Sequence, residues 1–102
     1  MNNFTWLQRW YLSHCDGAWE HRYGITIESL DNPGWRAAID LTDTELVETP
    51  FLRLEIKRSE TDWLQCWVAE SKFHLACGPE NLDEAIGVFK TWAETAPAAG
   101  RK

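Results

Sequence analysis

One cysteine stands where a predicted strand ends and a predicted helix begins. Cys77 lies in the segment LACGPEN, residues 75–81. A thiolate is stabilised near a helix N-terminus, but a nucleophilic cysteine also needs a base and donors for the developing charge. The candidate base, His74, lies three residues earlier and would point to the opposite face of the strand. A cysteine in such a place is more often a small buried apolar side chain, so both roles stay open for Cys77.

The other reactive or metal-binding side chains form no recognisable site. Cys15, Cys66 and Cys77 include no CxxC pair, and His14 and His21 beside Cys15 lack a second pair of ligands. The sequence also has no glycine-rich phosphate loop, HExxH, GxSxG or paired-carboxylate motif. We therefore predict no catalytic residues, no cofactor and no metal. Three cysteines without a visible secretory signal favour reduced thiols in a cytoplasmic protein.

Tryptophan is unusually frequent, with seven in 102 residues. Trp6, Trp10 and Trp92 lie on the apolar stripes of predicted helices, which places them in the core. Trp63 and Trp67 alternate with the apolar residues of a predicted strand, so we expect them on the face away from the core. Exposed aromatic side chains on a sheet are typical anchors of a binding surface. The alternatives are that another segment covers that face or that the strand is oriented the other way.

The segment from residue 16 to residue 23 mixes acids, bases, aromatic rings and an imidazole without regular periodicity. Such a segment is either a recognition loop or a clamp that fixes the first helix to the sheet, and the sequence supports both. Its candidate partner-binding residues are Asp16, Trp19, Glu20 and His21.

Acidic residues are concentrated in one third of the chain. Residues 16–48 hold eight acidic and two basic side chains, which accounts for the whole formal net charge of −6. Such a stretch repels a nucleic-acid backbone and speeds encounter with a basic surface, to which we expect Asp40 and Asp43 to contribute. Acidity that only keeps the protein soluble is the alternative. No basic stripe exists, so nucleic acid is not an expected partner. No stretch approaches the ~18 apolar residues of a membrane span, so a membrane is not an expected partner either.

Periodicity predicts a helix near each end of the chain. An apolar face that runs from Trp6 to His14 predicts the first helix, with Thr5 and Gln8 as its capping box. The glycine at position 17 follows its predicted end. The last helix begins after Asn81, the predicted cap, and carries an apolar stripe as far as residue 93.

Between these helices the pattern is one of short strands. Apolar and polar residues alternate in five segments between residues 23 and 77, with turn residues at 31–34 and 59–62. The order predicts an α+β fold, an antiparallel β-meander of about five strands flanked by an N-terminal and a C-terminal helix packed on one face. We expect residues 1–95 to form this single domain and residues 96–102 to be a disordered tail.

Several sequence blocks resemble one protein family. The blocks are WLQRWY (residues 6–11), CDGAWEHRYGI (15–25), LDNPGW (30–35), IDLT (39–42), DWLQC (62–66) and GPENL (78–82). In these blocks the chain resembles the immunity protein 53 family, which is predicted to protect bacteria from contact-delivered, polymorphic toxins. The resemblance covers residues 5–93. It implies a small cytoplasmic inhibitor that binds a cognate toxin domain, with no cofactor and no catalytic residues.

Three functions follow as hypotheses. In the first, the acids of residues 16–48, with Trp63 and Trp67 as anchors, occlude a basic active-site cleft on the toxin, and a nuclease cleft would fit. In the second, the chain is a rhodanese-like sulfurtransferase that uses Cys77, because similar proteins are sometimes labelled so. The chain lacks the alternating β/α order of rhodaneses, an arginine in the loop, and all but one of the loop glycines. In the third, it is a general adaptor or self-associating domain that uses the same aromatic face.

Overall fold

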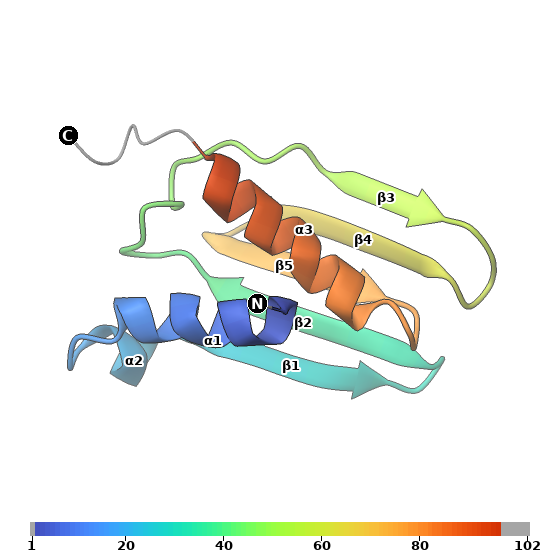
Figure 1. Ribbon diagram of the computed structural model, residues 1–102, viewed down its shortest axis with the longest axis horizontal. Helices are drawn as coiled ribbons and strands as arrows, with labels where there is room; N and C mark the ends of the chain where they lie inside the picture. Colours follow the sequence, from blue (N-terminus) through green and yellow to red (C-terminus); the bar gives the residue numbers. More distant parts are fainter. Residues whose placement is uncertain (1, 97–102) are drawn as a thin grey trace.

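The protein is built on one antiparallel sheet with its helices on one face (Figure 1). The computed structural model describes residues 2–96. Its strands are β1 (Ile25–Leu30), β2 (Gly34–Asp40), β3 (Leu54–Lys57), β4 (Trp63–Ala69) and β5 (Lys72–Cys77). Its helices are α1 (Asn3–His14), α2 (Trp19–Arg22) and α3 (Leu82–Thr95). This arrangement confirms the predicted α+β fold of five antiparallel strands with an N-terminal and a C-terminal helix. Residues 97–102 of the predicted tail lie outside the described residues.

The strand order is β1-β2-β5-β4-β3, with all neighbours antiparallel. It combines a hairpin, β1–β2, with a three-stranded meander, β3–β4–β5, whose last strand pairs with β2. The segment 41–53 carries the chain from β2 to the far edge of the sheet (Figure 1). Leu41 and Leu46 are fully buried there, and the Trp92 indole N–H donates to the Pro50 carbonyl at 2.9 Å. Apolar burial therefore fixes a connection that has no regular structure of its own.

The core lies between the sheet and α1 and α3. One face of β2, β4 and β5 supplies alternating buried side chains, which are Ala37, Ile39, Leu64, Cys66, Phe73, Leu75 and Cys77. Phe89 of α3 meets the ring of Trp10 in α1 at 5.0 Å and that of Phe73 in β5 at 4.9 Å. Burying one such side chain stabilises the fold by roughly 1.5–3 kcal/mol. Trp10 and Trp92 are core residues as predicted, and Trp6 is half-buried against Phe89.

The first helix begins earlier than its sequence suggests. The Asn2 side chain accepts a hydrogen bond from the backbone N–H of Thr5 at 2.7 Å, so Asn2 is the cap and Thr5 lies inside the helix. The predicted Thr5 capping box is therefore wrong, because asparagine offers an acceptor one turn upstream. The helix ends at His14, and Gly17 follows with a φ of +92°.

The start of α3 is tied to the turn between β3 and β4. Asn81 occupies the cap position but does not cap with its side chain. Its amide oxygen accepts from the Trp63 backbone N–H, and its amide N–H donates to the carboxylates of Asp62 and Glu84. Arg58 bridges the same two carboxylates, at 2.8 Å from Asp62 and 2.6 Å from Glu84. The predicted capping role of Asn81 is replaced by a tertiary contact.

Candidate interaction surface

One face of the sheet is free of helices, and we call it the open face (Figure 1). Among residues 2–96 no helix packs on this side, because α1 and α3 both lie on the other. Alternation along each strand assigns its side chains. They are Thr26, Glu28, Leu30, Arg36, Ala38, Asp40, Glu55, Lys57, Trp63, Gln65, Trp67, Ala69, Lys72, His74 and Ala76. Trp63 and Trp67 therefore have the predicted orientation, while their binding role remains a prediction.

Trp67 lies between the side chains of Arg53 and His74 on this face. The guanidinium carbon of Arg53 sits 5.0 Å from its ring centroid, and the His74 imidazole stacks on it at 5.3 Å and 13°. A cation over an indole contributes about 0.5–1 kcal/mol when exposed. The indole is thus held in one orientation while it stays half-exposed. Arg53 precedes β3 and His74 lies in β5, and the sequence named neither as a neighbour of Trp67.

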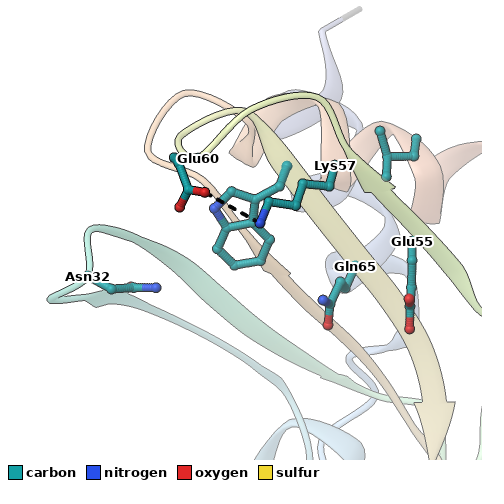
Figure 2. Close-up of a pocket in the computed structure, with 7 residues that line it drawn as sticks. Asn32, Glu55, Lys57, Glu60 and Gln65 are labelled. Atoms are coloured by element: carbon teal, nitrogen blue, oxygen red, sulfur yellow. Dashed lines mark ion pairs between the residues drawn. The ribbon is translucent and has the colours of Figure 1, made fainter.

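Trp63 borders a hollow at the opposite end of the open face from α2. Figure 2 shows Asn32, from the turn between β1 and β2, standing across from side chains of β3, β4 and the turn between them. Lys57 and Glu60 form an ion pair at 3.7 Å on the rim. The lining residues are Asn32, Glu55, Ile56, Lys57, Glu60, Trp63 and Gln65. Amide, indole and paired charged groups suit hydrogen bonding to a protein surface.

Only some of the indole N–H groups within residues 2–96 have a hydrogen-bond partner, and the buried N–H of Trp10 has none. Those of Trp19, Trp35 and Trp92 donate to backbone carbonyls of Thr42, Pro79 and Pro50 at 2.9–3.0 Å. In the described part of the chain, neither Trp63 nor Trp67 donates a hydrogen bond from its ring. Unlike the Trp10 N–H, which is buried in the core, the N–H groups of Trp63 and Trp67 belong to partly exposed rings and are therefore suited to an external acceptor.

The segment from residue 16 to residue 23 folds as a clamp. Trp19 is only 4% exposed, and its ring packs against Trp10, Tyr11, His14 and Tyr23. Burial removes Trp19 from the candidate partner-binding residues, because its side chain already belongs to the core. The structure thus favours the clamp over the recognition loop.

Two acids of this segment are occupied by its own backbone. Asp16 accepts from the N–H groups of Trp19 and Ala18, both at 3.0 Å, and these bonds lower the pKa of its carboxyl. The Glu20 carboxylate accepts from Asp16 and Gly17 at 2.9 and 2.8 Å. Hydrogen bonds lower the pKa of the Glu20 carboxyl. The bond from its own backbone N–H contributes most, and those from the N–H groups of Asp16 and Gly17 contribute less. Both acids shape the loop before α2.

The remaining candidates are spread over the molecule. His21 is exposed in α2, and Asp43 is exposed next to Thr42, whose carbonyl accepts from the Trp19 indole N–H of α2. Asp40 is half-buried on the open face, where it pairs with Lys72 and accepts from the Gly24 N–H at 2.9 Å. The structure therefore places Asp40 and Trp67 on one face and Trp63 at its far end, while Asp43 and His21 lie at the α2 end.

The surroundings of Cys77 are those of a buried structural residue. Its side chain is fully buried, and burial raises the pKa of the thiol to about 11. Cys66, on the same face, is also fully buried, and burial raises its thiol pKa to about 12. A nucleophilic cysteine has a lowered pKa and some exposure, so the sulfurtransferase hypothesis gains no support here. Among residues 2–96 no three His, Cys, Asp or Glu side chains are placed to hold a metal ion.

Comparison with known proteins bears on the chain as a whole. None of the helices within residues 2–96 is long and apolar enough to cross a membrane. No curated protein and no solved structure matches the chain significantly. A family model described as immunity protein 53 matches residues 4–94, which is most of the chain. The protein therefore belongs to the immunity protein 53 family, whose name implies immunity against a toxin.

Proposed function

We propose that this protein neutralises a cognate toxin domain by binding over its active site with the open face of the sheet. The observation that carries the proposal is the pair of half-exposed tryptophans on this face, Trp63 and Trp67. Both lack an acceptor for the indole N–H within residues 2–96, and both are accessible from outside, whereas the N–H of Trp10, which also lacks an acceptor, is buried. Tryptophan is enriched among residues that dominate binding energy at protein interfaces.

The geometry around Trp67 favours binding at low entropic cost. Arg53 and His74 already hold the ring from two sides, so little side-chain freedom is lost on association. A tryptophan buries roughly 150–250 Å² when it is covered, and its N–H supplies a directional contact. The hollow beside Trp63 offers a complementary depression for a protruding toxin side chain.

The excess negative charge of the protein favours attraction of a toxin with a basic surface. On the open face Glu28 forms an ion pair with Arg36, and Asp40 forms one with Lys72, so the charges of these acids are neutralised there. The uncompensated acids lie elsewhere, with Asp43 and Glu48 in the loop after β2. A toxin whose active site is a positively charged cleft, such as a nuclease, would be attracted by this excess negative charge.

The test is affinity for the toxin domain encoded beside this protein, measured by calorimetry together with growth protection in cells. Trp67→Ala and Trp63→Ala are each expected to weaken binding at least about tenfold, or about 1.4 kcal/mol. Leu12→Ala is the matched control, because Leu12 is an apolar side chain 69% exposed on α1, away from the open face. It should bind within about twofold of the wild type.

The opposite pattern would overturn the proposal. If both tryptophan variants are folded by circular dichroism and bind normally while Leu12→Ala binds weakly, the interface lies on the helical side. If Trp67→Ala loses both binding and folding, Trp67→Phe takes its place, because phenylalanine keeps a stacked aromatic ring while it removes the N–H donor and one of the two indole rings. That variant is expected to lose a smaller part of the affinity.

A further inference from the structure

The outer edge of β1 is unpaired. In the described residues β1 has one neighbour, β2, and the carbonyl of Gly24 accepts from the Asp40 N–H at 3.0 Å. Hydrogen-bonded and non-hydrogen-bonded pairs alternate along an antiparallel ladder. The even-numbered residues of β1 therefore bond to β2, whereas the backbone groups of Ile25, Ile27 and Ser29 point outward.

An apolar groove runs along this edge, between β1 and α1. Its lining includes Phe4, Leu7, Tyr11, Tyr23, Ile25 and Ile27. Phe4 is 40% and Ile27 39% exposed, which is high for side chains of this size. A six-residue edge strand with three residues whose backbone groups point outward, beside an apolar groove, forms a template for another strand.

The other edge of the sheet is built differently. β3 has four residues, and the same alternation places the charged residues Glu55 and Lys57 at its outward-pointing positions. Short length and charged side chains are the usual protection of an edge strand, and β1 has no proline, lysine or bulge. The contrast marks β1 as the edge that accepts a partner strand.

We propose that β1 pairs antiparallel with β1 of a second copy of this chain, about a two-fold axis at Ile27. The sheet then runs without interruption through both copies, and the two α1 helices lie on the same side of it. Phe4 and Ile27 of each copy would cover the groove of the other. A two-fold interface brings the same patch together from both copies.

The sequence of β1 favours one register for pairing with β1 of a second copy. The outward groups require Ile27 to face Ile27 of the second copy and Ile25 to face Ser29. On the open face Thr26 then faces Glu28, and the Glu28 charge is already paired with Arg36 at 3.6 Å. A shift by two residues in one direction would place Glu28 against Glu28, a destabilising like-charge pair. The opposite shift would leave Ser29 and Leu30 without a partner inside the strand.

The first test is the oligomeric state by sedimentation equilibrium over a range of concentrations. A single strand pair is a small interface, so we expect a weak dimer that forms at high micromolar concentration. Ser29→Pro removes only an outward N–H and should make the protein monomeric. Glu55→Pro is the matched control at the outward N–H of the other edge strand and should leave the dimer intact. A wild type that stays monomeric up to millimolar concentration, or a dimer lost equally in both variants, would overturn the proposal.

The second test fixes the register. Residues 26 and 28 of opposite copies form a non-hydrogen-bonded pair with Cα atoms about 4.5 Å apart, within the range of a disulfide. In a Cys15→Ser background, the double variant Thr26→Cys, Glu28→Cys should form covalent dimers under mild oxidation, and neither single variant should. Cross-linking by a single variant, or none by the double variant, contradicts the register. Because the outer edge of β1 is separate from Trp63 and Trp67, Ser29→Pro should still bind the toxin, which keeps this test independent of the proposed function.

Discussion

The chemistry of each tryptophan and cysteine depends on which side of the sheet it faces. Trp19 and Trp92 donate to backbone carbonyls and are buried, while Trp67 lies across the sheet with Arg53 and His74 as its neighbours. Cys77 alternates along β5 onto the core side, where its thiol is fully buried. One step along a strand reverses the face, so neighbouring residues have unrelated roles.

At this scale we predict that Cys77 has no chemical function. With a thiol-reactive disulfide reagent at pH 8, Cys15, which is half-buried, should react in the folded protein. Cys66 and Cys77 should react only as the protein unfolds, because burial raises their thiol pKa values to about 12 and 11. Cys15→Ser is the control that removes the fast phase, and Cys77→Ser should still protect cells from the toxin. Rapid labelling of native Cys77, or lost protection by a folded Cys77→Ser protein, would favour sulfurtransferase chemistry.

At the scale of elements, a polar network fixes α3 to the turn between β3 and β4. Asn81 donates to Asp62 at 2.9 Å, and Arg58 reaches both Asp62 and Glu84. Hydrogen bonds from Asn81 and Arg58 lower the pKa of the Asp62 carboxyl, with Asn81 contributing more. The same two side chains lower the pKa of the Glu84 carboxyl, and there Arg58 contributes more. The Arg58 pKa is raised by the same contacts, first with Glu84 and then with Asp62.

A lowered carboxyl pKa gives stability that is lost in acid. Folding favours the ionised form of Asp62 and Glu84, so their contribution is complete above about pH 5 and disappears as the pH falls through the folded pKa values. The effect is modest, because these side chains are 45% and 41% exposed. In urea unfolding, the wild type should lose more stability between pH 7 and pH 3 than Asp62→Asn does. Glu60→Gln, on the same turn with a 94% exposed carboxylate, should follow the wild type. Parallel pH curves for all three proteins would show that the network does not stabilise the fold.

At the scale of the whole molecule, the acidic third of the sequence does not form one acidic surface. The carboxylates of Asp16 and Glu20 accept hydrogen bonds from backbone N–H groups around the start of α2. Glu45 contacts His14 at 2.8 Å, and Asp40 pairs with Lys72. Within residues 2–96, no ion pair or side-chain hydrogen bond engages the carboxylates of Asp31, Asp43 and Glu48. Asp43 and Glu48 share the loop at the α2 end, so we assign the steering role to these two.

Steering predicts a change in association rate that depends on salt. The double variant Asp43→Asn, Glu48→Gln should associate with the toxin roughly two- to fivefold more slowly at low ionic strength, with an unchanged dissociation rate. At about 0.5 M salt the difference should vanish. Asparagine suits position 43, where φ is +63°. Asp40 is left intact, since replacing it would also free Lys72 and the Gly24 N–H. Stopped-flow kinetics measures both rates, and an association rate equal to that of the wild type would remove steering from the mechanism.

The sequence by itself determined the elements and their faces. Alternation in β4 assigned Trp63 and Trp67 to the side away from the core, and the apolar stripe of α3 assigned Trp92 to the core. These features are local, because strand and helix periods link residues only a few positions apart. The family was also readable in the sequence, since its blocks are runs of adjacent residues.

The tertiary structure alone decided which distant residues meet. The crossing segment 41–53 supplies the carbonyl for Trp92 and ends at Arg53, whose guanidinium lies over the ring of Trp67. The burial of Trp19, the switch of Asn81 from cap to tertiary contact and the free edge of β1 have the same origin. Strand order and docking are selected by the total apolar area buried, a property of the whole chain that no local pattern contains.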